Sequence, residues 1–189
     1  MKRTAVVALI AFAIALTPTS AHAKTDTRPM SAMQTCNPEP RSTHPISKST
    51  PRTYARADLW VYGDSITWQS RRHLRKSIPM RTAVDAHWGR NTKSAVDALL
   101  ADRRKHVAPK LVVMAVGTND LGDVNAFRKH VVRARKILPK RTRLLWVDVY
   151  VDTSGKYRAV NRAIRSVRGV KTLKWARLNI DRTRGATRS

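Results

Sequence analysis

Short apolar runs alternate with amphipathic stretches from Asp58 onward, and this alternation constrains the fold more than any other feature of the sequence. The clearest run, Leu111 to Val116, is unbroken, which is typical of a strand buried on both faces of a sheet. Between the runs, apolar residues recur at helical spacing. The pattern therefore predicts strands and helices alternating around a mainly parallel sheet. We expect strands near 59–62, 80–84, 111–116, 144–149 and 170–175, and helices near 68–78, 92–104, 123–138 and 157–167. Residues 85–91 should form a loop, with Asn91 as the cap of the helix that follows.

Five strands separated by helices indicate one three-layer α/β/α domain, which we place at residues 58–180. Right-handed crossover connections put the carboxyl end of every parallel strand at the same edge of such a sheet. The loops after the first three strands should therefore meet beside a topological switch point, where α/β domains bind ligands. This geometry brings Ser65, Gly89 and Asn119 together although they lie far apart in the sequence.

The two ends of the chain differ from this domain in composition. Lys2 and Arg3 precede an apolar run that is too short to span a membrane stably, and small residues at 21–23 follow it. We therefore predict a signal peptide at 1–23, cleaved near Ala23, and a secreted protein that is extracellular or associated with the cell wall. Residues 24–57 are rich in Pro, Ser, Thr, Lys and Arg, which predicts a disordered tether. Residues 181–189 are a basic tail.

The chain is strongly basic, because its 38 Lys and Arg against 12 Asp and Glu give a formal net charge of +26. For an exported protein this charge predicts attraction to anionic surfaces such as cell-wall polymers and acidic glycans. A basic surface that serves only solubility stays an alternative. Nucleic acid is the less favoured partner, because the sequence has no interleaved aromatic platform and no nucleic-acid-binding motif. Cys36 is the single cysteine, which excludes an internal disulfide and a multi-cysteine zinc site.

Two motifs follow predicted strands, Gly63-Asp64-Ser65-Ile66-Thr67 and Gly117-Thr118-Asn119-Asp120. A strand that ends on a glycine, an acid and a serine lifts one hydroxyl above the sheet edge, beside the backbone N–H groups of the next helix. The two motifs, in this order, resemble those of the SGNH or GDSL hydrolases, which include esterases and lipases. The resemblance implies a flavodoxin-like strand order of 2-1-3-4-5 and the hydrolysis of acyl or acetyl esters.

By this resemblance Ser65 is the nucleophile, and three donors bind the oxyanion: the backbone N–H groups of Ser65 and Gly89 and the side-chain amide of Asn119. A neutral amide donates without carrying charge, and a glycine lets the backbone approach closely. Each residue also has an ordinary structural alternative, as a helix cap, a turn glycine or an Asx-turn residue. The supporting residues, which hold the two turns in shape, are Gly63, Asp64, Gly117 and Asp120.

The sequence departs from the family near its carboxyl end, where members carry an Asp-x-x-His motif that supplies the general base. Here Asp181 is followed three positions later by Arg184, whose guanidinium accepts no proton at neutral pH. His87, two residues before Gly89, is the one histidine that the predicted topology can place near Ser65, so we consider it as a substitute base. Asp148 and Asp152, near the end of the fourth strand, are candidates for orienting an imidazole.

Two functions from different classes follow from these observations. The first is a secreted serine ester hydrolase that works through a Ser65 acyl-enzyme, with an ester on a polysaccharide or cell-wall polymer as one substrate. The second is a degenerate family member that binds an ester or anionic glycan without turnover, because the usual histidine is absent. A third interpretation, a basic protein adhering to anionic polymer, predicts binding that weakens steeply with salt. The sequence has no phosphate-binding glycine loop or metal-ligand motif, so we expect no cofactor and no metal.

Overall fold

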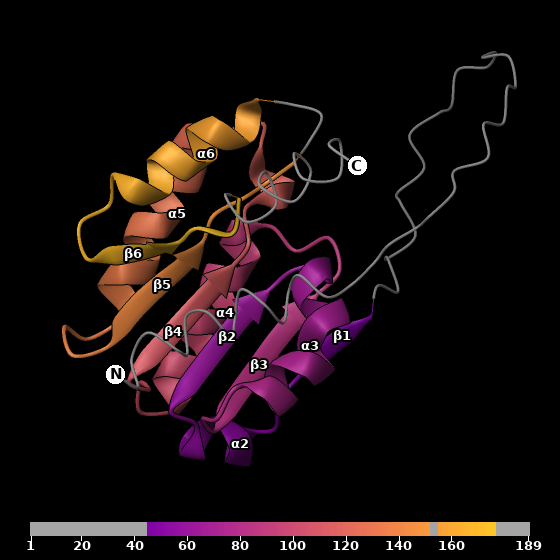
Figure 1. The fold of residues 1–189 in the computed structure, drawn as a ribbon. Coiled ribbons are helices and arrows are strands. Elements are labelled where there is room, and N and C mark those ends of the chain that lie inside the picture. Colours follow the sequence, from indigo (N-terminus) through magenta and orange to yellow (C-terminus); the bar gives the residue numbers. More distant parts are fainter. Residues whose placement is uncertain (1–44, 152–154, 177–189) are drawn as a thin grey trace, which may run out of the picture.

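A six-stranded sheet lies between two layers of helices in the computed structural model of the protein, which describes residues 45–151 and 155–176 (Figure 1). The strand order is β1-β3-β2-β4-β5-β6, and all neighbouring strands are parallel except β1 and β3. Without β1 this is the predicted order 2-1-3-4-5, so the three-layer fold is confirmed, with six strands in place of five. The strands are β1 (Ile46–Lys48), β2 (Leu59–Gly63), β3 (Thr82–His87), β4 (Leu111–Ala115), β5 (Arg143–Val147) and β6 (Val170–Leu173).

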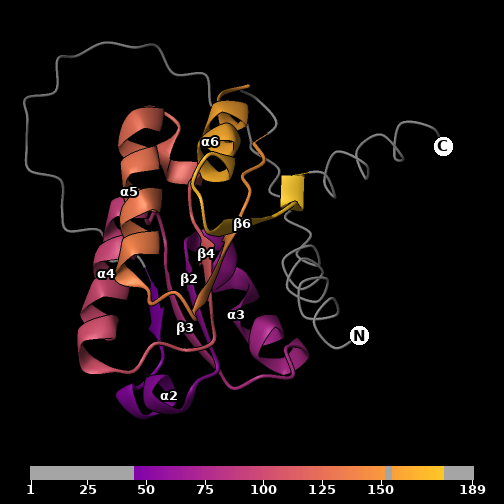
Figure 2. The same cartoon turned by 90° about the vertical axis from the view of Figure 1, so that its left-hand side faces the viewer.

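The helices divide unequally between the two faces of the sheet, with α3 on one face and α4, α5 and α6 on the other (Figure 2). Alternate residues of the strands face opposite layers. Val61 and Val84 therefore share a core with Leu74 of α3, while Tyr62 and Met114 share the larger core under the other three helices. The helices are α2 (Pro51–Arg56), α3 (Ser65–Ser77), α4 (Thr92–Lys105), α5 (Val124–Ile137) and α6 (Lys156–Arg165), and η1 (Thr118–Asp120) is a 3-10 turn.

Polar side chains fix the starts of three helices at one edge of the sheet. Asp64, Asn91 and Asp123 are the N-caps of α3, α4 and α5, and each accepts a hydrogen bond from a backbone N–H of the first turn. The cap at Asn91 was predicted. The cap at Asp64 was not, and for this reason α3 begins at Ser65 rather than near Trp68.

The predicted tether at 24–57 is wrong for its last part, because β1 and α2 are both ordered elements. β1 pairs antiparallel with β3 along the edge of the sheet, with Ile46 opposite His87. Pro51 occupies the first turn of α2, where proline is tolerated and its missing N–H has no consequence. Tyr54 is buried against Trp60, at 5.3 Å between ring centroids. One aromatic anchor and one row of backbone hydrogen bonds thus order a segment whose composition predicts disorder.

β3 also differs from the prediction, which ended this strand at Val84 and placed a loop over 85–91. The strand continues to His87, and Asp85 within it is buried. A charged residue in a buried strand needs charged partners, and Asp85 has them in Arg90 and Lys48. Such partners come from tertiary structure, so a local sequence pattern gives no sign of them.

Other predicted segments lie outside the described residues, namely the signal peptide at 1–23, residues 24–44 of the tether and the basic tail at 181–189. Within the described ranges, no helix is both long enough and apolar enough to cross a membrane.

Candidate active site

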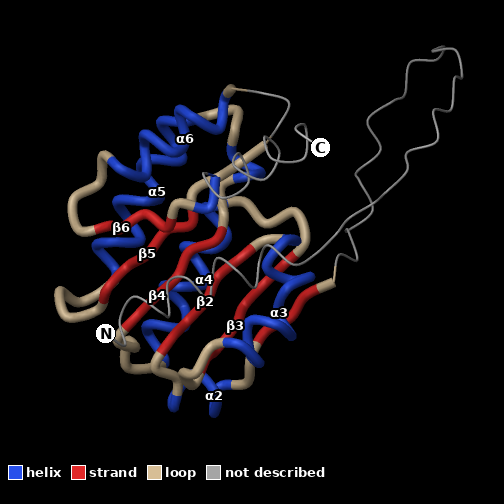
Figure 3. Tube along the Cα trace, in the orientation of Figure 1, coloured by secondary structure: helices blue, strands red, loops and turns tan. Residues whose placement is uncertain are grey.

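The register of the sheet brings the loops after β2, β3 and β4 to the same level at one edge (Figure 3). Gly63, the last residue of β2, lies opposite Ala86 of β3 on one side and Ala115 of β4 on the other. The Asp64 N–H extends this pairing by donating to the carbonyl of Ala115 at 3.3 Å. The predicted gathering of these loops at the carboxyl edge is therefore confirmed, and each of them carries a predicted site residue.

The turn from β2 into α3 places Ser65 as the first residue of α3, partly buried at the amino end of the helix. The alternative role for Ser65, as the helix cap, belongs instead to Asp64, whose Oδ1 accepts from the Ile66 N–H at 3.0 Å. Gly63 is required here, because a Cβ at this position would lie 2.0 Å from the Thr67 Oγ1. The tight turn thus places Ser65 at the start of the helix, beside its first N–H groups.

Asp64 is only 3 % exposed, and this burial raises the pKa of its carboxyl to about 6, against backbone N–H donors that lower it. Its predicted role of shaping the turn by accepting backbone hydrogen bonds agrees with this geometry.

The second motif forms η1 at the end of β4. Gly117 has a φ of +138°, and a Cβ there would lie 2.8 Å from a methyl group of Val149, so the position requires glycine. Asp120 accepts from the Thr92 N–H with both carboxylate oxygens, at 2.9 and 3.1 Å, and from the Thr92 hydroxyl at 2.8 Å. Asp120 thereby joins the β4 loop to the start of α4.

Asn119 lies on the surface of the same turn, and its Nδ2 donates to the backbone carbonyl of Arg90 at 3.0 Å. Gly89, directly before Arg90, is exposed and has a φ of +64°. The side chain of Asn119 therefore meets the β3 loop beside Gly89, as the predicted pair of oxyanion donors requires. An amide NH2 carries two hydrogens, so this bond leaves Asn119 one N–H for another acceptor. In the described part of the chain, no hydrogen bond joins Ser65 to Asn119 or Gly89 directly.

His87 lies on the face of the sheet opposite α3. It follows Ala83 and Asp85 at the two-residue spacing of a strand, and Ala83 belongs to the core under α4. Its Nε2 lies 2.6 Å from Oδ1 of Asp85, so the imidazole is directed back along β3. The structure thus pairs His87 with Asp85 and not with Ser65, and its role as a substitute base stays a prediction that these contacts do not support.

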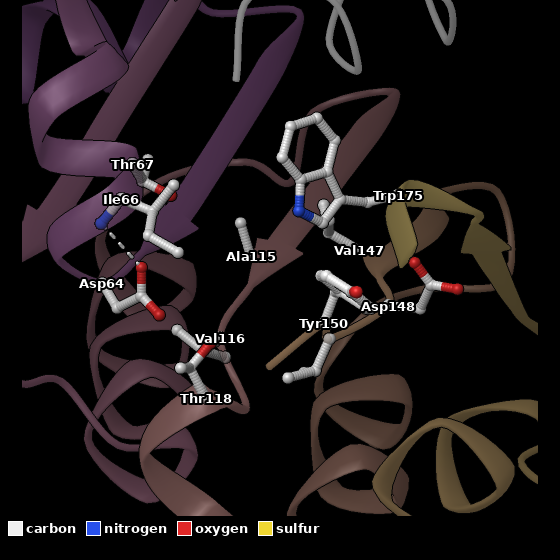
Figure 4. A pocket seen from close by; sticks show the side chains of 11 residues that line it. Asp64, Ile66, Thr67, Ala115, Val116, Thr118, Val147, Asp148, Tyr150 and Trp175 are labelled. Carbon is white, nitrogen blue, oxygen red and sulfur yellow. Dashed lines mark hydrogen bonds between the residues drawn. The ribbon is translucent and has the colours of Figure 1, made fainter. Parts of the chain in front are cut away.

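A small cavity of about 30 Å³ opens beside the β2–α3 turn (Figure 4). Asp64 and Thr118 lie on one side of it, and Asp148, Tyr150 and Trp175 lie on the other. Apart from Thr67, the remaining lining is apolar and comes mainly from the ends of β4 and β5. Ser65 and Asn119 border this edge but do not line the cavity. Asn119 lines a larger, more open hollow of about 380 Å³ between the starts of α4 and α5.

Asp152 lies outside the described residues, and Asp148 does not orient an imidazole within them. Its Oδ1 accepts from the Ala176 N–H at 2.6 Å, and its own N–H donates to the carbonyl of Leu173. Burial raises the pKa of this carboxyl, while the backbone donors oppose the shift. Sequence reasoning missed Tyr150 and Trp175 as residues of this cavity, although Tyr150 directly follows one predicted strand and Trp175 ends another at the same edge.

A pair of contacting aromatic rings, Trp68 and Trp88, lies next to the β3 loop and was not predicted from the sequence. The two rings meet edge to face at 6.1 Å between centroids, and Trp88 is 38 % exposed. The guanidinium of Arg71 stacks over Trp68 at 3.8 Å from the ring centroid. Among the described residues, no group of three or more His, Cys, Asp or Glu side chains is placed to hold a metal ion.

The strand order and the helix layers define a three-layer α/β/α fold like that of the SGNH hydrolases, and one solved structure agrees with this fold. The chain is similar to the C-terminal catalytic domain of peptidoglycan O-acetyltransferase A (OatA) from Streptococcus pneumoniae, at 21 % identity and a TM-score of 0.56. That match covers 67 % of this chain and 73 % of the OatA domain. TesA aligns at 18 % identity and a TM-score of 0.43, over 57 % of this chain and 71 % of TesA. The OatA likeness shows the fold, whereas the TesA score is too low to carry weight.

The chain matches no protein-family model and no curated protein sequence. Any activity must therefore be argued from its own residues.

Proposed function

We propose that this protein is a secreted serine hydrolase that cleaves acyl or acetyl esters through a Ser65 acyl-enzyme. The observation that carries the proposal is the register that sets the Ser65, Gly89 and Asn119 loops side by side at the carboxyl edge. The same edge also carries a positive-φ glycine, Gly89, and a neutral amide, Asn119, which donates to the carbonyl of Arg90, the residue after that glycine.

In this mechanism the Ser65 Oγ attacks the ester carbonyl carbon and loses its proton to a base. The carbonyl oxygen becomes an oxyanion, which accepts hydrogen bonds from the backbone N–H groups of Ser65 and Gly89 and from the Asn119 amide. Collapse of the tetrahedral intermediate expels the alcohol and leaves an acyl group on Ser65. Water then attacks this acyl group and releases the acid, which regenerates the hydroxyl.

The substrate class follows from two further observations. The chain carries a net charge of +26, which draws anionic polymers to its surface. The structural neighbour OatA is named for acetyl transfer on peptidoglycan, and an ester on a cell-wall polysaccharide is a substrate that an exported protein meets. We therefore place the natural substrate among acylated polysaccharides.

A second function, binding without turnover, is favoured by one specific observation. His87, the predicted substitute base, is paired with Asp85 on the face opposite α3, so its imidazole is not directed at Ser65. The sequence has Arg184 where the family has its base, and residues 181–184 lie outside the described ranges. A protein of this kind would retain the pocket and bind an ester or an anionic glycan.

The deciding experiment is hydrolysis of p-nitrophenyl acetate by the mature protein beside Ser65→Ala and His87→Ala. Turnover that is lost in Ser65→Ala and kept in His87→Ala supports a serine hydrolase with another base. Loss in both variants nominates His87. Equal, background-level rates in all three samples contradict the hydrolase and favour the binder. Binding to an anionic polymer that falls steeply with salt and survives Ser65→Ala would instead favour simple adhesion.

A further inference from the structure

We propose that Asp85 and Arg90 are positioning residues, which hold the Gly89 turn and the Asn119 amide in one fixed arrangement for oxyanion binding. The inference rests on the proposed function, because an oxyanion site has a purpose only if Ser65 carries out acyl transfer. Neither residue belongs to the two motifs.

The first observation is a buried ion pair that closes the β3 loop. The guanidinium of Arg90 is 2 % exposed, and its Nη1 donates to both the backbone carbonyl and the Oδ1 of Asp85, each at 3.0 Å. Its Nη2 donates to Asp85 Oδ2 at 3.3 Å. The planar, five-donor fork of arginine makes this grip possible, whereas a lysine offers a single point charge. Residues 86–89 are therefore held between the two ends of one ion pair.

The second observation connects this loop to the next one. The backbone carbonyl of Arg90 accepts from the Asn119 amide at 3.0 Å, so the residue that closes the β3 loop also anchors the side chain expected to bind the oxyanion. The bond from Asp120 to Thr92 ties the same two loops a second time. Gly89, with its left-handed backbone, lies directly beside this junction.

The third observation is that the carboxylate of Asp85 stays charged although it is 1 % exposed. Burial alone would raise its pKa, but the bond from His87 and the charges of Arg90 and Lys48 outweigh burial and lower the pKa to about 2. Lys48 reaches Asp85 Oδ2 at 3.3 Å and Asp102 Oδ1 at 3.0 Å, and Tyr62 donates to the other oxygen of Asp102. Lys48 of strand β1 thus supplies a cation that pairs with Asp85 and helps to hold the β3 loop.

A purely stabilising role explains this arrangement poorly. Well-packed apolar residues usually stabilise a protein as much as a buried ion pair does, because taking two charges out of water is costly. What a forked ion pair adds is geometry, since it fixes direction as well as distance. Oxyanion donors need such precision, because a displacement of about 1 Å can lower a rate about a hundredfold.

The test compares Arg90→Lys and Asp85→Asn with Arg133→Lys in the mature protein. Arg133 makes the same kind of contact with Asp97, at 2.6 Å, but both side chains are 40 % exposed and lie on α4 and α5. With p-nitrophenyl acetate we expect kcat to fall about 10- to 100-fold in Arg90→Lys at a nearly unchanged KM, because the lost donor geometry matters mainly in the transition state. Arg133→Lys should stay within about twofold of wild type. A fall in Arg90→Lys no larger than in Arg133→Lys, or one confined to KM, would overturn the proposal.

Amide hydrogen exchange gives a second readout that does not depend on turnover. In Arg90→Lys we expect faster exchange at residues 88–92, with unchanged protection in β2 and β4. Uniformly faster exchange would show a global loss of stability and contradict a positioning role, and so would unchanged exchange in the loop. If wild type fails to turn over the ester, the proposed function fails, while the exchange profile still decides whether the ion pair holds the loop.

Discussion

The two halves of the carboxyl edge are built differently. The loops after β2, β3 and β4 are linked by motif residues. Asp64 donates to the carbonyl of Ala115 at the end of β4, Asn119 donates to Arg90, and Asp120 accepts from Thr92. The loops after β5 and β6 are held by residues outside both motifs. Asn161 of α6 clamps the backbone of Val149 through two hydrogen bonds of 2.7 Å.

The two halves differ in the chemistry that they could support, which is binding of negative charge in the first half and removal of a proton in the second. The bonds of the first half hold the proposed N–H donors in a fixed arrangement, as the proposed oxyanion site requires. In the second half, the buried carboxylate of Asp148 accepts a hydrogen bond from the backbone N–H of residue 176. The sequence contains no histidine after His130. The first half therefore supports acyl chemistry more strongly than the second, and the following experiments test each side of the contrast.

The largest effect is expected for Ser65→Ala, which removes the proposed nucleophile. We expect the rate of ester hydrolysis to fall at least about a thousandfold, to the level that binding and oxyanion donors alone provide. Ser94→Ala, at an exposed position of α4, is the matched control and should keep wild-type turnover. A Ser65→Ala protein with wild-type kcat/KM would contradict the role proposed for Ser65, and with it the assignment of acyl chemistry to the first half.

The next effect is expected for Asn119→Ala. Loss of one oxyanion donor typically lowers kcat about a hundred- to a thousandfold, and because this side chain is exposed we expect little change in the melting temperature. Asn91→Ala is the matched asparagine control. It removes the cap of α4 and should lower the free energy of unfolding by about 1 kcal/mol while kcat stays the same. Similar kinetics in the two variants would mean that Asn119 is a structural residue only.

A smaller effect, on stability, is expected for Lys48→Met. This change leaves the buried carboxylates of Asp85 and Asp102 without a shared cation, which should cost about 2–3 kcal/mol after allowance for the 42 % exposure of Lys48. Lys93→Met breaks an exposed pair with Asp97 and should cost no more than about 0.5 kcal/mol. Urea unfolding of both variants measures the difference, and equal costs would show that β1 does not support the first half.

The smallest effect concerns Asp64 and the pH dependence of stability. Its pKa in the folded protein is about 6, above the ordinary value of 3.8, so between pH 4 and 6 the folded state holds more protons than the unfolded state. Its contribution is therefore fully present below pH 4 and is lost as the pH rises through 6. Asp64→Asn keeps a good cap and should remove this decline, a difference on the order of 1–2 kcal/mol. Parallel urea-unfolding profiles of the two proteins across this window would contradict the raised pKa.

The main features of the fold could be predicted from the sequence because they depend on local patterns. The run from Leu111 to Val116 and the apolar stripes of the helices follow the periods of strand and helix. The cap at Asn91 requires only residues within one turn. The β1 and α2 segment was missed for the opposite reason, because its order comes from partners such as Trp60 and the edge of β3, which its own composition does not reveal.

The amino-acid sequence by itself determined the alternation of strands and helices, the serine turn at 63–67 and the amide turn at 117–120, since each is a matter of residues close together in the chain. Only the tertiary structure decided that Asn119 bonds to Arg90, that Lys48 reaches Asp102, and that His87 lies on the face away from α3. The physical reason is that a buried charge or amide is stable only beside a partner. That partner here comes from another strand or loop, so its position is fixed by how the sheet is assembled.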